Sequence, residues 1–310
     1  MRIGVVGAGG VGGYFGARLA AAGHDVGFLV RGAQLTALRT TGIEIHSPRG
    51  NLHLTDVRAS DDPDELGAHD VVLFAVKAYA IDGALPALQP LLGADGFVVS
   101  LQNGGVAPAE RVAAAVGVER TVGGAAYISC HLRAPGVLEH HSPLAGMEIG
   151  ELGGGSSARV EEFTERARDA DIDAVAAPDI RTVLWQKLAF ICGLAGATAS
   201  SRHPIGEVRA TEAGQRLLRG LVSEAAAVAR ADGAALADDF EDKTLGLLNR
   251  LDPGMRSSLY EDLAHGRVLE LDSLHGEIVR RADALGLDVP VTRTVYAVLE
   301  PFARAAAAPA

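Results

Sequence analysis

Cysteine is scarce in this chain of 310 residues, which contains only Cys130 and Cys192. Two cysteines supply neither a disulfide framework nor a cysteine zinc site, and their scarcity is typical of a reducing compartment. Basic residues are also outnumbered, because 28 Lys and Arg stand against 39 Asp and Glu and give a net charge of −11. Such an acidic chain is a poor candidate for binding nucleic acid or an anionic membrane surface.

Long hydrophobic runs are missing as well. No segment offers the roughly 20 uncharged apolar residues that a membrane span needs. The N-terminus reaches the glycines after Val6 without the apolar core of a signal peptide. We therefore expect a cytoplasmic protein without a membrane partner. The contents of 48% apolar and 22% charged residues are typical of a globular protein, and the length predicts two domains.

The first half of the chain alternates short apolar runs with helical segments. The runs lack the period-2 alternation of a half-exposed strand, so they indicate strands that are buried on both sides. This order predicts an open, doubly wound parallel sheet of the Rossmann type. The predicted strands are residues 3–6, 26–30, 71–76 and 97–101, and the predicted helices are residues 11–22, 81–92 and 107–116.

Two further segments predict extended structure at the edge of this sheet. Residues 42–58 alternate apolar and polar side chains around Ser47-Pro48-Arg49-Gly50, which predicts a hairpin or an edge-strand insertion. Residues 121–151 are expected to be extended, with turns near residues 134–136 and at Ser142-Pro143. A glycine-rich turn and a helix then lead to a last strand at residues 172–176.

After Pro178 the pattern predicts helices alone, the first of them capped by Asp179. We therefore divide the chain into a dinucleotide-binding Rossmann domain, residues 1–177, and an all-α substrate and catalytic domain, residues 178–310. The helices carry more apolar surface than one short domain needs, so a homodimer is expected. The later helices are predicted at residues 212–232, 239–248, 255–263, 268–285 and 292–303.

The segment Gly7-Ala8-Gly9-Gly10-Val11-Gly12 matches the pattern G-x-G-x-x-G. It follows a predicted strand and opens a predicted helix, which is the context that dinucleotide binding requires. Gly7 permits the tight turn, Gly9 lets the backbone approach a pyrophosphate, and Gly12 lets the helix pack closely on the strand. The alternative is a purely structural turn, and we favour the dinucleotide.

The end of the second predicted strand decides which dinucleotide is expected. An NAD-specific site would carry Asp or Glu there to bind the ribose 2′-hydroxyl, but Asp25 lies at the opposite end of this strand. Arg31 follows the strand instead and can make charge-assisted bonds to a 2′-phosphate. We predict NADP(H), the alternative being that Arg31 is an ordinary solvent-exposed arginine.

Further short motifs follow the glycine loop. They are Val76-Lys77-Ala78, Gln102-Asn103-Gly104, Leu184-Trp185-Gln186-Lys187-Leu188, Ser257-Ser258-Leu259 with Asp262, and Glu270 before Gly276. In this order they resemble the ketopantoate reductase (2-dehydropantoate 2-reductase) family over nearly the full chain. The resemblance implies a Rossmann domain followed by a helical domain like that of 6-phosphogluconate dehydrogenase. It also implies that NADPH reduces a 2-oxo acid, 2-dehydropantoate to pantoate, at a site between the two domains.

Lys187 and Glu270 are the candidate catalytic residues. Lys187 lies among apolar residues at helical spacing, a pattern that by itself favours a lysine reaching past an apolar face to solvent. The resemblance implies instead that Lys187 is the general acid, which stabilises the developing oxyanion and donates a proton to it. Glu270, expected on a late helix, is by pattern a solvated residue. By resemblance it is an active-site glutamate that holds Lys187, the substrate or the nicotinamide.

The resemblance assigns three further residues. Asn103 follows a predicted strand, at the edge where such sheets bind ligands, and would contact the nicotinamide and the substrate; Asn-Gly is also an ordinary turn dipeptide. Lys77 would contact the cofactor, or else lie at the surface. Ser258 would bind the substrate, although Ser257-Ser258 also fits a helix cap.

The chain departs from the family at three positions where asparagines bind the substrate. Ile191, Ala195 and Ile205 stand there instead. Apolar pockets discriminate less strongly than pockets that hydrogen-bond a hydroxyl. We therefore expect a substrate less polar than ketopantoate, unless other residues have taken over recognition. The candidates for that are Ser200, Ser201, Arg202 and His203.

Other reactive residues predict no second site. Glu139-His140-His141 lacks the spacing of a zinc helix, so no metal is expected, and no G-x-S-x-G elbow supports hydrolysis. Cys192 is expected in the core and Trp185 in packing at the domain junction. Two alternatives to a 2-oxo acid reductase stay open. One is reduction of an imine by the same fold, and the other is a non-catalytic NADP(H)-binding protein, in which Lys187 and Glu270 would lie far apart.

Overall fold

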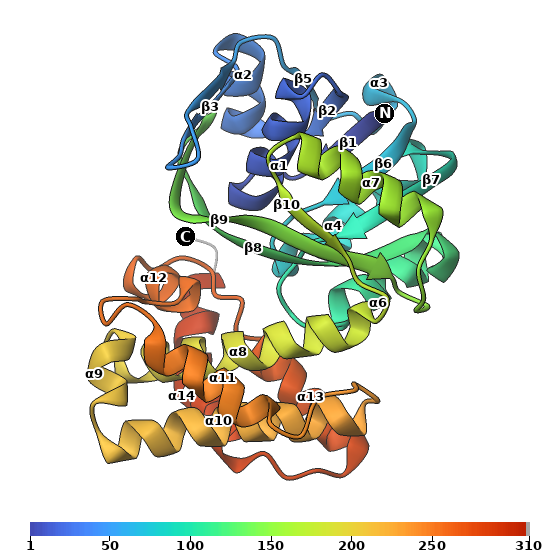
Figure 1. Ribbon diagram of the computed structural model, residues 1–310. Helices are drawn as coiled ribbons and strands as arrows, with labels where there is room; N and C mark the ends of the chain where they lie inside the picture. Colours follow the sequence, from blue (N-terminus) through green and yellow to red (C-terminus); the bar gives the residue numbers. More distant parts are fainter. Residues whose placement is uncertain (308–310) are drawn as a thin grey trace. The chain divides into compact units, whose positions relative to one another are not determined.

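The structure, a computed structural model, describes residues 1–307 (Figure 1). It consists of two compact units. The first unit comprises residues 1–102 and 108–183, and the second comprises residues 103–107 and the chain from Leu184 onward. The final division between the units falls within helix α8 (Ile180–Ser201), between Val183 and Leu184.

A ten-stranded sheet forms the first unit, in the order β4-β3-β9-β8-β7-β6-β1-β2-β5, with β10 paired to β9. The six strands from β5 to β8 along this path run parallel, and Ile3 of the central β1 pairs with Val26 on one side and Val71 on the other. These six are β1 (Arg2–Val6), β2 (Asp25–Leu29), β5 (Arg58–Ser60), β6 (His69–Phe74), β7 (Leu92–Ser100) and β8 (Thr121–Ala134).

The sheet carries a hydrophobic core on each face. Along β6, Val71 and Leu73 belong to one buried cluster, whereas Val72 and Phe74 belong to a second. Because successive side chains of a strand point to opposite faces, helices must cover both sides. The predicted doubly wound, Rossmann-type sheet is therefore confirmed. The first cluster includes side chains from α1 (Gly10–Ala21), α2 (Gly32–Thr40) and α7 (Ala158–Asp169), and the second from α3 (Pro63–Leu66), α5 (Leu88–Leu91) and α6 (Ala107–Val116).

The far edge of the sheet is mixed: β8 with β9 and β3 with β4 pair antiparallel, whereas β3 pairs parallel to β9. β8 forms a long hairpin with β9 (Val137–Glu151); beyond it lie β3 (Ile43–His46) and β4 (Leu52–Leu54), and β10 (Asp173–Ala176) pairs parallel to β9. The predicted 42–58 hairpin and the turn near 134–136 are confirmed. The predicted turn at Ser142-Pro143 is wrong, because β9 continues through it and the pairing is interrupted there by a bulge opposite Ser129. A bulge tolerates proline, which has no N–H for the ladder.

The single helix predicted over residues 81–92 is also wrong. Residues 78–91 form four short pieces, because Pro86 and Pro90 lack the N–H that an uninterrupted helix needs at those positions. Helix α2, which the apolar spacing did not reveal, follows directly after Arg31. The four pieces are η1 (Ala78–Ala80), α4 (Ile81–Ala84), η2 (Leu85–Ala87) and α5.

The second unit is helical, and its described residues contain no strand, so the predicted all-α half is confirmed. Helix α13 begins at His275, so the prediction that Glu270 lies within a helix is wrong. Leu269, Leu271 and Leu274 are all buried, and burial in a turned segment produced the apolar spacing there. The helices after α8 are α9 (Ile205–Arg209), α10 (Glu212–Ala231), α11 (Phe240–Arg250), α12 (Ser258–Ala264), α13 (His275–Leu285) and α14 (Pro290–Ala307).

Helix α8 is the one described helix that is long and apolar enough to cross a membrane. Most of it is buried within the protein, as expected for a core helix. It also carries the charged residues Arg181 and Lys187, which a membrane span would have to accommodate.

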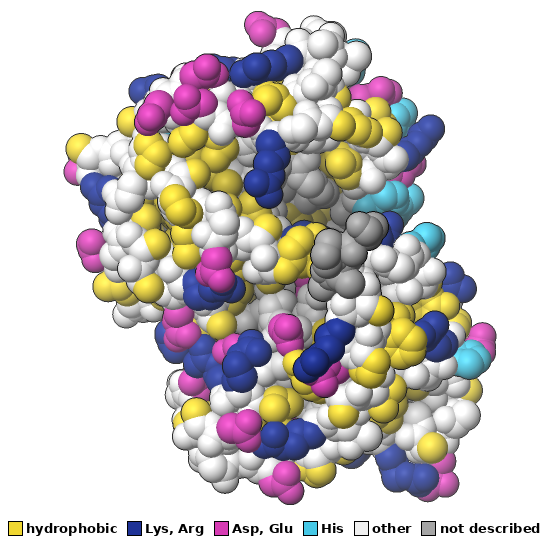
Figure 2. Space-filling view, turned by 180° about the vertical axis from the view of Figure 1, so that it is seen from behind, with side chains coloured by type: hydrophobic (Ala, Val, Ile, Leu, Met, Phe, Trp, Pro, Cys, Tyr) yellow, Lys and Arg dark blue, Asp and Glu magenta, His cyan; other side chains and the backbone are white. Residues whose placement is uncertain are grey.

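Charges of both signs are mixed on the face drawn in Figure 2, where Lys and Arg side chains lie among Asp and Glu. The protein also forms exposed ion pairs, such as Lys243 with Asp239 at 2.9 Å. Exposed pairs of this kind contribute little to stability, on the order of 0–1 kcal/mol each. On this face no stretch of one sign offers a surface for an extended polyanion.

Candidate functional site

The glycine loop joins β1 to α1. Gly7 has a φ of +92°, which lets the chain turn sharply after Val6. A Cβ on Gly12 would lie 2.2 Å from the carbonyl oxygen of Gly7, so only glycine allows the helix this close to the strand. A Cβ on Gly9 would meet no atom within 4 Å, so this side of the loop is open. The loop therefore has the turn, the close packing and the free space that a pyrophosphate requires at a helix N-terminus.

Backbone hydrogen bonds join the carboxyl ends of four parallel strands, β1, β2, β6 and β7, next to this loop. The N–H of Gly7 donates to Leu29 at the end of β2 at 3.2 Å, and the N–H of Ala75 donates to Val6 at 2.9 Å. The N–H of Leu101, after β7, donates to Phe74 at the end of β6 at 3.0 Å. Residues that follow these strands thus lie along one edge of the sheet, where open α/β sheets bind ligands.

Arg31 and Lys77 lie at this edge. Arg31 is exposed and immediately precedes α2, two residues beyond the end of β2. Lys77 is also exposed and immediately precedes η1, after β6. Ala8 is buried and Val11 is half-buried, so their side chains contribute to packing and only their backbone faces the loop. The first unit therefore offers two cations beside a glycine loop, a set suited to the phosphates of a dinucleotide.

Gln102 is a residue of this edge that the sequence analysis did not single out. Its side-chain nitrogen donates to the carbonyl oxygen of Phe74 at 2.7 Å, and its oxygen accepts from the hydroxyl of Ser100 at 2.6 Å. Both bonds are buried, so they fix the chain as it leaves β7. Gln102 thereby sets the starting point of the Asn103 segment, which the Gln-Asn-Gly motif alone did not explain.

The charges of Lys187 and Glu270 interact in the second unit, although 82 residues separate the two in the sequence. Lys187 is half-buried on α8, and Glu270 is only 8% exposed. Burial lowers the pKa of the Lys187 amine to about 8, and the neighbouring charge of Glu270 opposes this shift. An amine with a pKa near neutral pH, held by a buried carboxylate, is suited to donating a proton.

Residues 103–107 pack on α8 beside Lys187. Gly105 has a φ of +66°, and a Cβ there would lie 2.8 Å from Cδ2 of Leu188. Asn103, at the start of this segment, is half-buried. The structure thus brings Asn103 to the helix that carries Lys187, within one unit.

The two serines at the start of α12 have different environments. Ser257 is buried; its hydroxyl caps α12 by accepting from the N–H of Tyr260 at 3.0 Å, and it bonds the hydroxyl of Thr198 at 2.8 Å. Ser258 is exposed. The capping role therefore falls to Ser257 and leaves the hydroxyl of Ser258 available to a ligand.

A partly buried polar network supports the first half of α8. The indole N–H of Trp185 donates to Asp232 at 3.0 Å, and Asp232 also accepts from Arg281 at 2.7 Å. Arg281 donates in turn to Glu277 at 2.6 Å and lies over the Trp185 ring at 5.6 Å. This network joins α8 to α13, which follows the Glu270 segment, so Trp185 does more than fill space. It links the two elements that position the catalytic candidates.

Two family models match the chain: "Ketopantoate reductase PanE/ApbA" over residues 3–154, and "Ketopantoate reductase PanE/ApbA C terminal" over residues 179–303. An uncharacterized oxidoreductase, YkpB of Bacillus subtilis, is 33% identical over 302 residues, covering 97% of this chain and 99% of its own. The 2-dehydropantoate 2-reductase of Caulobacter vibrioides is 34% identical, covering 96% and 97%. The crystal structure of a PanE/ApbA family ketopantoate reductase from Ralstonia eutropha has a TM-score of 0.90 at 30% identity, covering 99% of both chains.

The chain belongs to the ketopantoate reductase family. It is therefore an oxidoreductase of the NAD(P)-dependent class, and the resemblance drawn from the short motifs is confirmed.

The three positions that depart from the asparagines of the ketopantoate reductase family lie in different surroundings. Ile191 is half-buried on α8, one turn after Lys187 and thus on the same helix face. Ala195 and Ile205 are buried in the helical core, with exposed fractions of 1% and 0%. Of the three, Ile191 is the apolar residue beside the amine.

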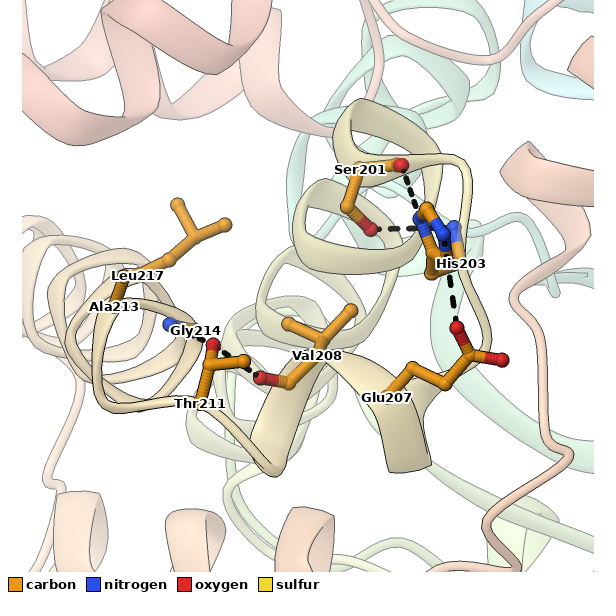
Figure 3. Close-up of a pocket in the computed structure, with 8 residues that line it drawn as sticks. All are labelled: Ser201, His203, Glu207, Val208, Thr211, Ala213, Gly214 and Leu217. Carbon is orange, nitrogen blue, oxygen red and sulfur yellow. Dashed lines mark hydrogen bonds and ion pairs between the residues drawn. The ribbon is translucent and has the colours of Figure 1, made fainter.

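Ser201 and His203 line a pocket of about 470 Å³ between the end of α8, α9 and the start of α10 (Figure 3). His203 is bonded there to the carbonyl oxygen of Ser201 at 2.6 Å and lies 3.6 Å from Glu207. Helix α8 is continuous from Lys187 to Ser201, so at 1.5 Å per residue these positions lie roughly 21 Å apart. One small 2-oxo acid cannot touch both ends, and the structure gives no support to substrate recognition by residues 200–203.

Cys192 is buried, and burial raises the pKa of its thiol. The sequence-based assignment of Cys192 to the core is thus confirmed. Across residues 1–307 the structure shows no group of three or more His, Cys, Asp and Glu side chains that could hold a metal ion.

Proposed function

We propose that this protein reduces the ketone of a 2-oxo acid to the 2-hydroxy acid with NADPH, with 2-dehydropantoate as the first candidate substrate. The observation that carries the proposal is the pairing of the half-buried Lys187 amine with the buried Glu270 carboxylate. A protein that only bound NADP(H) would have no use for an amine and a carboxylate whose charges interact in this way, so the interaction supports catalysis over binding alone.

The first unit would hold the nucleotide. The open side of Gly9 and the N-terminus of α1 suit the pyrophosphate, and Lys77 lies at the same edge. Arg31 supports NADPH over NADH, because β2 ends without an acidic residue and Asp25, at its start, pairs with Arg58 at 3.1 Å. Bound there, NADPH would supply the hydride for the carbonyl carbon.

The second unit would hold the carbonyl oxygen. As the ketone is reduced, negative charge develops on this oxygen, and the Lys187 ammonium would stabilise the charge and donate the proton that completes the alcohol. Glu270 would keep Lys187 protonated and oriented. Asn103, on the segment packed against α8, would orient the substrate, and the exposed Ser258 would bind it.

A less polar 2-oxo acid is the second candidate substrate. Ile191 lies one helical turn from Lys187, where a polar side chain would be needed to bond a substrate hydroxyl. An apolar neighbour favours a substrate whose side chain is a hydrocarbon. An imine of similar shape is the third candidate substrate for the same residues.

The test is a substrate panel, followed by the loss of absorbance of the reduced nicotinamide. We expect NADPH oxidation with 2-oxo acids, and a kcat/KM ratio between ketopantoate and a purely aliphatic 2-oxo acid that identifies the substrate class. Ile191→Asn should move this ratio toward ketopantoate. If the protein binds NADPH but turns over none of the 2-oxo acids, the proposed reductase activity would be contradicted and only nucleotide binding would be supported.

Two expectations about the whole molecule remain predictions. Leu247 of α11 and Val298 of α14 are about half exposed, at 50% and 49%, which supports a homodimer. Light scattering after size-exclusion chromatography measures the assembly, and a monomer at micromolar concentration would contradict it. The cytoplasmic location is testable by cell fractionation.

A further inference from the structure

Gln34 of α2 joins two backbone segments of the first unit. Its side-chain nitrogen Nε2 donates to the carbonyl oxygen of Ala8, in the glycine loop, at 3.0 Å, and its oxygen Oε1 accepts from the N–H of Gly136 at 3.0 Å. The two partners fix the orientation of the amide, because a carbonyl oxygen only accepts and a peptide N–H only donates. Gln34 is half-buried, so water competes weakly for these bonds.

Gly136, the backbone partner of the Gln34 side-chain oxygen, is itself held in place by the hairpin turn and by β3. It forms the turn between β8 and β9 with a φ of +77°, and it is buried. Its carbonyl oxygen accepts from the N–H of Glu44 at 2.8 Å, which ties the turn to β3. The remaining N–H of Gly136 is the one that Gln34 satisfies, and a buried N–H without a partner is costly.

The β8–β9 hairpin also touches the glycine loop directly. A Cβ on Gly10 would lie 2.0 Å from the carbonyl oxygen of Cys130, and a Cβ on Gly13 would lie 2.9 Å from Cδ1 of Leu138. The loop and the first turn of α1 are therefore held against the hairpin by close contact at Gly10 and Gly13 and by the Gln34 amide at Ala8. Ala8 immediately precedes Gly9, whose open side faces the proposed pyrophosphate.

We propose that Gln34 is a positioning residue for the dinucleotide, which holds the glycine loop in its binding geometry before the nucleotide arrives. The inference rests on the proposed function, since that places the pyrophosphate at Gly9. A loop that is fixed beforehand loses less conformational freedom on binding, so the affinity is higher. The pyrophosphate is common to NADPH and NADH, so Gln34 acts on both equally, whereas Arg31 acts on NADPH alone.

Two variants and a matched control test this. Gln34→Met keeps the size of the side chain and removes both bonds, and Gln34→Glu keeps the acceptor for Gly136 but has no donor for Ala8. Gln89→Met is the control, because exposed Gln89 on α5 also donates to a backbone carbonyl, that of Ala115 at 3.4 Å. The measurements are Kd for NADPH and NADH by nicotinamide fluorescence, kcat and KM by absorbance, and Tm.

We expect Gln34→Met to weaken NADPH and NADH by the same factor, about 5- to 30-fold, as for the loss of one or two net hydrogen bonds. KM for the nucleotide should rise with Kd, while kcat at saturation stays within about twofold of wild type. Gln34→Glu should weaken both nucleotides at least as much, because a carboxylate beside Ala8 repels phosphate. Gln89→Met should change neither nucleotide affinity.

Unchanged affinities in Gln34→Met, or a loss confined to NADPH, would overturn the inference while leaving the proposed function intact. A fall in Tm without the split between KM and kcat would mean a merely structural role and would also overturn it. If Gln34→Met does not fold, the same measurements on Gln34→Glu test the inference. Wild-type protein that binds neither nucleotide would overturn the proposed function and this inference together.

Discussion

The glycine loop of the first unit and the Lys187–Glu270 pair of the second unit are built in opposite ways. The loop is a run of six neighbouring residues that works through backbone N–H groups, a left-handed glycine and empty space. The pair consists of two charged side chains far apart in the sequence, one half-buried and one buried. The loop depends on the absence of a Cβ at Gly9. The pair depends on the change that burial makes to the pKa of the Lys187 amine.

Under the proposed function, this difference would separate nucleotide binding from catalysis. Changes in the loop should alter nucleotide affinity and leave the proton donor alone, whereas changes in the pair should alter turnover and leave affinity alone. Four predictions test that separation, beginning with the largest expected effect.

Lys187→Ala should lower kcat by about 10³-fold or more, because it removes both the charge that stabilises the oxyanion and the proton donor. Kd for NADPH should stay within about twofold, since the glycine loop is untouched. Lys243→Ala is the matched control, because Lys243 is an exposed lysine on α11 paired with Asp239. Steady-state rates measure kcat, and fluorescence titration measures Kd for NADPH. Near-normal turnover in Lys187→Ala would contradict the proposal that Lys187 is the general acid.

Gly9→Ala and Gly12→Ala should separate affinity from stability within the loop. The new Cβ at position 9 meets open space in the free protein, so Tm should hold while both nucleotides weaken about 10- to 100-fold through crowding of the pyrophosphate. The Cβ at position 12 would meet the Gly7 carbonyl at 2.2 Å, so Gly12→Ala should lower Tm by several degrees. Equal loss of Tm in both variants would contradict the open side of Gly9.

Arg31→Ala should weaken NADPH about tenfold and leave NADH unchanged, because one charge-assisted bond to a 2′-phosphate is lost. Arg39→Ala, at an exposed arginine on the helix that follows Arg31, is the comparison for the loss of one positive charge, and Tm reports the loss of its bond to the Ala59 carbonyl oxygen. The ratio of the two KM values is the measurement. A wild-type preference for NADH would contradict the prediction of NADP(H).

Glu270→Gln should move the pH profile of kcat. If Lys187 is the proton donor that we propose, its acid form is the active one, and the rate should fall as pH rises through its pKa of about 8. Glu270 raises that pKa, so removing its charge should shift the fall to lower pH, by about one unit for a close opposite charge. A profile that moves to higher pH in Glu270→Gln would show that the carboxylate does not act on Lys187.

Prediction from the sequence succeeded where the signal is local and failed where packing decides. The strands at residues 3–6 and 71–76 and the glycine loop are contiguous, so their residues set their own conformation. Pro86 and Pro90 broke an apolar pattern that looks like one helix. Glu270, expected on a helix, lies in a turn because three nearby leucines are buried there.

By itself the sequence determined the doubly wound sheet, the loop at Gly7 and the helical second half, because backbone conformation and hydrophobic periodicity are properties of neighbouring residues. Only the tertiary structure decided that the charges of Lys187 and Glu270 interact, that Ser257 and not Ser258 is the buried cap, and that Gln34 supports the loop. The electrostatics of a lysine and the satisfaction of a buried N–H depend on residues that the chain brings together only by folding.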